Sequence, residues 1–134
     1  MNKLEYIPGD LVTYNGNIVT IENSDGYYAT YYDKDEYLQE VNVNVIKGIP
    51  LTSEILEKNG WKLLKHHKRN SYDDVSWTSY HKPAETNISL RFYPEENVFF
   101  PFLYAQEISE TPIRYIHQLQ HLLFGLSINH EMEV

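Results

Sequence analysis

Short alternating runs of apolar and polar residues dominate the first fifty positions. Residues 10–14 and 17–22 form two such runs around Asn15-Gly16, a pair that tolerates the positive φ angles of a two-residue hairpin. Residues 27–32 form a third run, and valine alternates with asparagine over residues 41–45. Strands this short and closely spaced predict a small curled sheet. An SH3-like barrel is the commonest way to close a sheet of this size.

A short helix is predicted over residues 50–60. Thr52 suits the N-cap, and Glu54 in the first turn favours the positive end of the helix. Gly60 is free to adopt the left-handed conformation that ends many helices. Trp61 follows in the position where a Schellman motif places an apolar residue.

From residue 61 to residue 108 the pattern returns to strands separated by polar turns. The clearest strand covers residues 87–93, where Ile88, Leu90 and Phe92 share one face. This segment predicts an antiparallel β-meander.

The longest helical pattern covers residues 112–127. Thr111 provides a cap, and Pro112 suits the first helical position because its missing N–H has no helical partner. We expect the apolar face of this helix to lie on the meander. The residues of that face are Ile116, Leu119, Leu122, Leu123 and Leu126.

These elements predict an α+β protein with two modules. Residues 1–50 would form the SH3-like curled sheet. Residues 51–134 would form an α+β module of short helix, meander and C-terminal helix packed on the meander. A chain of 134 residues has the length of one ordinary domain, so we expect the modules to form one compact unit.

The charge and the absent cysteines narrow the function classes. Acidic residues outnumber basic ones by 19 to 11, and the net charge of −8 disfavours binding to nucleic acid or to an anionic membrane. Without cysteine there are no disulfides, thiolate metal sites or cysteine nucleophiles. No apolar run resembles a signal peptide or a membrane helix, so we expect a cytoplasmic protein.

One basic cluster, Lys65-His66-His67-Lys68-Arg69, is flanked by two tryptophans. Cations beside aromatic rings can hold a phosphate while a base stacks. The bland alternative is an exposed turn whose charges favour solubility. On the first interpretation the ligand-binding residues are Trp61, Lys65, His66, Lys68, Arg69 and Trp77.

His117 and His121 are four residues apart on the predicted helix. This spacing brings two imidazoles together, as in the H-E-x-x-H metal motif. The motif glutamate is absent here, since the segment reads His-Gln-Leu-Gln-His. We therefore expect a solvated or hydrogen-bonded pair on the polar side of the helix, with no metal and no cofactor.

Tyrosines crowd the segment around residues 27–37. With a period of two, Tyr27 and Tyr31 face one way and Tyr28 and Tyr32 the other. One pair must enter the core, and the other would form an exposed aromatic strip suited to contacts. The alternative, which we favour, is that the second pair is ordinary protein surface.

Two stretches carry a resemblance to a known family. Residues 49–61 read Ile-Pro-Leu-Thr-Ser-Glu-Ile-Leu-Glu-Lys-Asn-Gly-Trp, and residues 113–122 read Ile-Arg-Tyr-Ile-His-Gln-Leu-Gln-His-Leu. They resemble the two signatures of a family of small uncharacterised proteins encoded by phages and prophages of gut anaerobes. The hairpin around Asn15-Gly16 is also similar to the opening of that family. The family pattern has asparagine where this chain has His121.

The resemblance implies a phage or prophage accessory protein but carries no activity with it. The chain has no nucleophile elbow, P-loop or dinucleotide fingerprint. We therefore expect a non-catalytic binding protein that sequesters a host signalling nucleotide or engages a host protein, and so acts as a counter-defence factor. The alternatives are a metal-dependent enzyme using His117 and His121, and a nucleic-acid adaptor acting through the SH3-like module. A homo-oligomer stays open.

Overall fold

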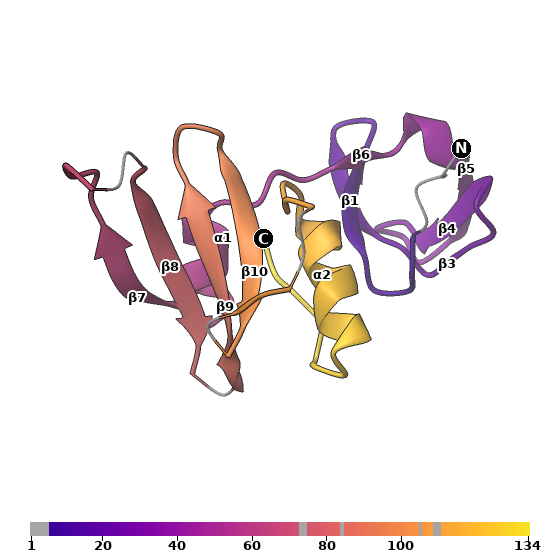
Figure 1. The fold of residues 1–134 in the computed structure, drawn as a ribbon. Coiled ribbons are helices and arrows are strands. Elements are labelled where there is room, and N and C mark those ends of the chain that lie inside the picture. The colour runs from indigo at the N-terminus through magenta and orange to yellow at the C-terminus, as the bar shows by residue number, and fades with distance from the viewer. Residues whose placement is uncertain (1–5, 73–74, 84, 105, 109–110) are drawn as a thin grey trace. The chain divides into compact units, whose positions relative to one another are not determined.

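The computed structural model is an α+β structure with three antiparallel sheets and two helices in the part of the chain that it describes (Figure 1). The chain divides into two compact units. The first unit contains Met1–Pro50 and Tyr115–Met132, and the second contains Leu51–Arg114 and Glu133–Val134. The described residues are 6–72, 75–83, 85–104, 106–108 and 111–134.

The first unit opens with the predicted hairpin. Strand β1 (Leu11–Tyr14) pairs antiparallel with β2 (Asn17–Thr20) and, on its other side, with β6 (Lys47–Gly48). The turn residues Asn15 and Gly16 have φ angles of 51° and 80°, which confirms the hairpin prediction.

A second sheet of this unit has the order β3-β4-β5, with bounds Asn23–Ser24, Tyr28–Tyr32 and Leu38–Asn42. The predicted strand over residues 41–45 is wrong beyond Asn42, because Val43–Val45 forms a 3₁₀ turn, η1. The Asn42 side chain accepts the N–H of Asn44 at 2.9 Å. This local bond satisfies a donor that a strand would have to pair across the sheet, so the turn replaces the strand.

The core of these strands is apolar and aromatic. It draws on both sheets, and Tyr14 packs against it from the side. Its buried members are Tyr6, Val12, Val19, Ile21, Ala29, Tyr31, Val41, Val43 and Ile46.

Helix α2 spans Ile116–Gly125 and starts later than predicted. The prediction of a start at residue 112 is wrong because Ile113 is extended and exchanges two backbone hydrogen bonds with Phe99, of 2.7 and 3.0 Å. Leu119 and Leu123 are buried, which confirms the predicted apolar face. Neither described helix has the length and apolar character needed to cross a membrane.

The division of the chain differs from the modules expected from the sequence, since α2 belongs to the first unit and contacts β1 there. Gln120 is completely buried, and its Oε1 accepts the N–H of Leu11 at 2.8 Å. Its Nε2 donates to the carbonyls of Gly9 at 2.7 Å and His130 at 3.0 Å. The polar side of α2 therefore makes the specific contacts with the N-terminal segment.

The second unit begins with α1 (Ser53–Lys58), as predicted. Thr52 is its N-cap, and its hydroxyl oxygen accepts the N–H of Ile55 at 3.2 Å. Gly60 has a φ of 88°, and the N–H of Trp61 donates to the carbonyl of Leu56 at 3.0 Å. The expected Schellman ending is confirmed.

The predicted meander is a five-stranded antiparallel sheet of order β11-β10-β9-β8-β7, with α1 beside it (Figure 1). One face contributes Tyr80, Leu90 and Phe99 to the core of this unit. Strand β7 is an edge and is largely exposed. The strands are β7 Lys62–His67, β8 Trp77–Lys82, β9 Glu85–Tyr93, β10 Val98–Leu103 and β11 Gln106–Glu107.

We predict that Leu123→Ala lowers the free energy of unfolding by about 2–5 kcal/mol, because it leaves a cavity at a buried site. Phe124→Ala is the matched control on the same helix, since Phe124 is largely exposed, and it should cost much less. Urea denaturation of both variants measures the difference. Equal costs for the two substitutions would contradict the assignment of the helix face.

Candidate functional site

The outer face of the five-stranded sheet gathers cations around one tryptophan. The rings of His67 and Trp77 stack, with centroids 5.1 Å apart and planes 19° apart. The guanidinium carbon of Arg91 lies 3.8 Å from the Trp77 ring centroid and 4.2 Å from that of Phe102. The Nζ atom of Lys65 lies 5.8 Å from the Trp77 centroid. We call these five residues the basic aromatic face.

The register of the strands places these side chains together. His67 of β7 pairs with Trp77 of β8. Ser79, two residues along from Trp77, pairs with Lys65 on one side and with Arg91 on the other. Because residues paired across antiparallel strands point to the same face, the five-residue cluster follows from alternation and register.

The cations on this face and the nearby Arg69 differ in their partners. Lys65 and Arg91 have no carboxylate partner within the ranges that the structure describes. In contrast, Nη2 of Arg69 forms an exposed ion pair with Oε1 of Glu95 at 2.5 Å. The positive charge available to an anion at this face therefore comes from Lys65 and Arg91.

The structure brings together two of the six residues predicted as ligand contacts, Lys65 and Trp77. His66 points to the opposite face, where its Nδ1 lies 2.9 Å from Oγ1 of Thr78. Trp61 is 1% exposed and belongs to the core, so its ring does not join this surface. Lys68 and Arg69 are exposed and follow the end of β7.

Three residues of the face, His67, Arg91 and Phe102, were missed in the sequence. His67 takes the place expected for His66, because a shift of one residue along a strand reverses the face. Arg91 lies on the opposite side of the alternating strand from Ile88 and Leu90, so its direction was readable. That Trp77 would be its partner could not be predicted, because the pairing of β8 with β9 is a tertiary contact.

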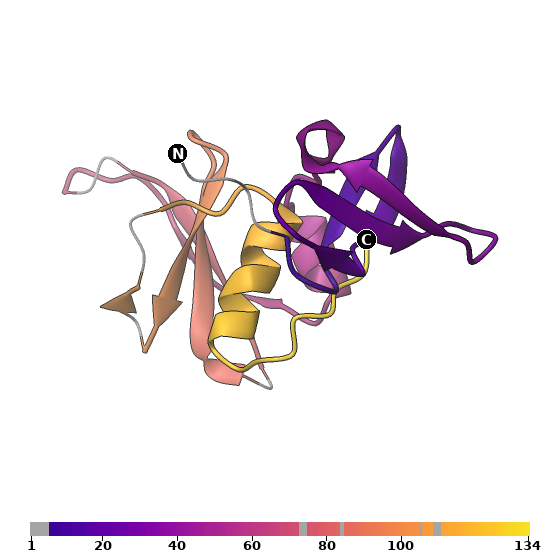
Figure 2. The ribbon, with the colours of Figure 1, turned by 90° about the vertical axis from the view of Figure 1, so that its right-hand side faces the viewer.

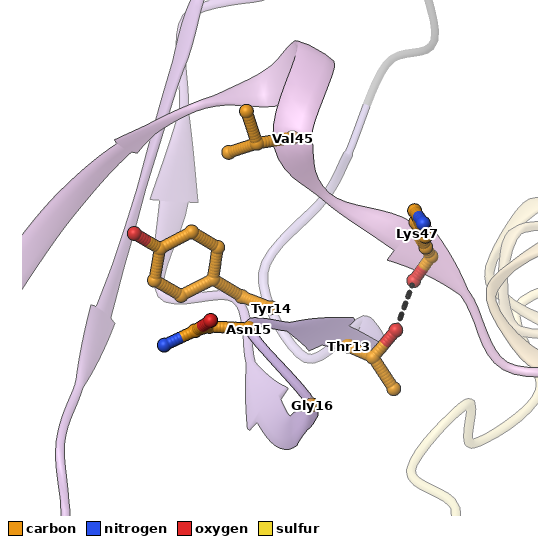
Figure 3. Close-up of a pocket in the computed structure, with 6 residues that line it drawn as sticks. All are labelled: Thr13, Tyr14, Asn15, Gly16, Val45 and Lys47. Carbon is orange, nitrogen blue, oxygen red and sulfur yellow. Dashed lines mark hydrogen bonds between the residues drawn. The ribbon is translucent and has the colours of Figure 1, made fainter.

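A hollow of about 290 Å³ lies beside the first hairpin of the first unit (Figure 3). The hydroxyl of Thr13 donates to the carbonyl oxygen of Lys47 at 3.2 Å, and the Tyr14 ring borders the opening. One cation and no buried polar side chain face this hollow, so it offers little to fix a ligand. Its lining is Thr13, Tyr14, Asn15, Gly16, Val45 and Lys47.

The predicted histidine pair belongs to a polar cluster inside the first unit. Asp10 is completely buried, and its Oδ2 lies 2.7 Å from Nε2 of His121 and accepts the N–H of Ile7 at 3.0 Å. The His117 ring centroid lies 5.8 Å from that of His121 and 5.4 Å from that of Tyr6. His121 is therefore hydrogen-bonded, as one of our two interpretations expected, whereas His117 is 3% exposed and not solvated.

Several atoms of this cluster lack partners. Both ring nitrogens of His117, the Tyr6 hydroxyl and Oδ1 of Asp10 are buried without a hydrogen bond from any residue described. Burial lowers the pKa of His117, with the Asp10 carboxylate opposing the change and His121 adding to it. Burial and the Asp10 charge raise the pKa of Tyr6.

A metal site at this cluster would need a third ligand besides the two histidines. Across the described ranges, no group of three or more histidine, aspartate or glutamate side chains is arranged to hold a metal ion. In the cluster, the carboxylate of Asp10 pairs with the His121 ring.

Comparison with protein-family models, with curated proteins and with solved structures found no match. The family resemblance of residues 49–61 and 113–122 therefore stays a prediction from the sequence.

We predict that His117 makes the fold sensitive to acid. Its folded pKa is lowered from the ordinary 6.5, so below about pH 6.5 the unfolded chain takes up a proton that the folded chain resists. The stability contributed by neutral His117 is complete above that pH and is lost progressively as the pH falls toward the folded pKa.

Urea denaturation between about pH 8 and pH 5 checks this expectation. His117→Phe keeps a ring in the core and removes the titration, so its free energy of unfolding should fall less over this range than that of the wild type. His66→Gln, at an exposed histidine of the second unit, is the control. An unchanged pH dependence in His117→Phe would contradict the prediction.

Proposed function

We propose that this protein is a non-catalytic binding protein that holds a nucleotide, or another small phosphate-bearing ligand, on the basic aromatic face. The observation that carries the proposal is the contact of Arg91 and His67 with the Trp77 ring, beside Lys65 without a carboxylate partner. The side chains of this face are cations and aromatic rings, which suit the binding of an anionic ligand that carries a ring.

The chemistry of the face fits a phosphate joined to a base. Lys65 and Arg91 would contact the phosphate, and each charge-assisted hydrogen bond contributes about 1.5–3 kcal/mol. The His67–Trp77 pair supplies aromatic surface for the base, and stacking contributes about 1–3 kcal/mol. The face thus combines two independent sources of affinity within one sheet.

A small ligand suits this protein better than a long nucleic acid. The net charge of −8 repels an extended phosphate backbone, because most of the surface carries the same sign as the polymer. A nucleotide needs only the local positive charge of the face. The charge of the protein therefore favours nucleotide binding over the nucleic-acid adaptor function.

We also infer an SH3-like barrel for the strands of the first unit. β1 pairs with both β2 and β6, and the 3₁₀ turn Val43–Val45 leads into β6. A strand paired on both sides in this way supports closure of a small curled sheet.

The biological setting of the proposal comes from the resemblance to phage and prophage proteins. In that setting the protein acts in the cytoplasm of the infected host as a counter-defence factor. Sequestering a host signalling nucleotide would remove the signal without chemical turnover. Engagement of a host protein is the second form of the same proposal.

Isothermal titration calorimetry with a panel of linear and cyclic nucleotides at low salt tests the proposal. We expect at least one nucleotide to bind, and we expect Lys65→Ala to weaken it about tenfold or more. Arg91→Lys keeps the charge but loses the planar group over the two rings, so it should also weaken binding.

Lys34→Ala is the matched control, since it removes one exposed lysine from the first unit. The substitutions at Lys65 and Lys34 should leave thermal stability nearly unchanged, because both side chains are exposed. Absence of binding by the wild type across the panel would overturn the nucleotide form of the proposal.

A further inference from the structure

The hairpin of β4 and β5 carries an ordered aromatic surface on its outer side. Paired residues of the two strands share a face, so the register defines that surface. We call it the tyrosine face. Its pairs are Tyr28 with Asn42, Thr30 with Glu40, and Tyr32 with Leu38.

Alternation along β4 separates this face cleanly from the core. Ala29 and Tyr31 are buried, whereas Tyr28 is 47% exposed and Tyr32 is 55% exposed. Across the strand pair, Leu38 is 56% exposed. Tyr28 and Tyr32 are therefore the pair that stays outside the core. Tyr27 does not join Tyr31 in the core, since β4 begins only at Tyr28.

The hairpin is strongly acidic. Glu40 lies at the middle of the tyrosine face and has no basic partner among the residues described. Asp33 organises the turn, where the N–H of Tyr37 donates to its carboxylate at 2.9 Å and lowers its pKa. The acidic residues of segment 22–40 are Glu22, Asp25, Asp33, Asp35, Glu36 and Glu40, against the single cation Lys34.

We propose that the tyrosine face is a docking surface for an extended, arginine-rich segment of a partner protein. Tyrosine rings attract guanidinium groups through their faces, and Leu38 offers apolar contact for the side-chain stems. Glu40, which lies between Tyr28 and Tyr32 along the hairpin, can accept a bidentate pair of hydrogen bonds from one arginine. The face therefore matches a cation with planar geometry better than a compact ammonium.

Charge decides among the other occupants of this exposed sheet face. A nucleic acid or an anionic lipid surface would meet the carboxylates of segment 22–40 and be repelled. A second copy of this chain would place Glu40 against an equally acidic hairpin. A positively charged protein segment is the occupant that gains from both the rings and the carboxylates.

The spacing of the face also sets the form of the segment. Tyr28 and Tyr32 are four residues apart on one strand, which is about 13 Å. An extended partner with arginine at every second residue would bring one guanidinium to each ring and one to Glu40. The hairpin extends from the rest of its unit in Figure 2. The side chains of Tyr28, Tyr32 and Leu38 are all exposed.

Fluorescence anisotropy with the full chain and a labelled peptide of alternating arginine and glycine tests this proposal. We expect binding at low salt, weaker binding of the lysine peptide, and none of the peptide with citrulline in place of arginine. Combining Tyr28→Ser with Tyr32→Ser should weaken binding about fivefold or more. Glu40→Gln should weaken it and reduce its dependence on salt.

Matched controls separate the face from general charge attraction. Tyr72→Ser removes a fully exposed tyrosine of the second unit, and Asp35→Asn removes a carboxylate of the turn outside the paired face. Both should bind the arginine peptide nearly as the wild type does. The proposal is overturned if the arginine peptide does not bind, if it binds the double tyrosine variant as well as the wild type, or if the citrulline peptide binds equally.

Discussion

The first unit depends on one buried side-chain amide, that of Gln120. It accepts the N–H of Leu11 and donates to the carbonyls of Gly9 and His130. Leaving the buried N–H of Leu11 without its partner would alone cost about 1–3 kcal/mol. The start of β1, helix α2 and the C-terminal segment are therefore held together through a residue 109 positions from Leu11. The first unit is thus built from segments that lie far apart in the sequence.

In each unit one face of a sheet is directed to the core and the other is not. In the first unit the core takes Ala29 and Tyr31 from β4 and leaves Tyr28 and Tyr32 outside. In the second unit the core takes one face of the meander, and the other gathers the cations around Trp77. The two surfaces are opposite in charge. Our proposals accordingly give one surface an anionic ligand and the other a cationic partner.

Local patterns predicted much of the fold, and the misses come from one local side-chain bond and from long-range partners. Thr52 caps its helix as expected, because capping needs only residues three positions apart. The side chain of Asn42 ended a predicted strand, and the bridge of Ile113 with Phe99 delayed a predicted helix. The role of Gln120 could not be predicted, because nothing near it in sequence reveals its partners in the N-terminal segment. Lys65 and Trp77 were predicted from the basic cluster and its flanking tryptophans, but the rest of their face required the sheet register.

Residue-resolved amide hydrogen exchange of the wild type and of Gln120→Leu tests the role of Gln120 most directly. The wild type should protect the amides of Leu11 and of Ile116, which donates to the carbonyl of Ile49 at 2.8 Å. The substitution should remove both protections together. The amide of Phe99, bonded to Ile113 in the second unit, should keep its protection. Fast exchange of the Leu11 amide in the wild type, or undiminished protection of Ile116 in the variant, would contradict this account.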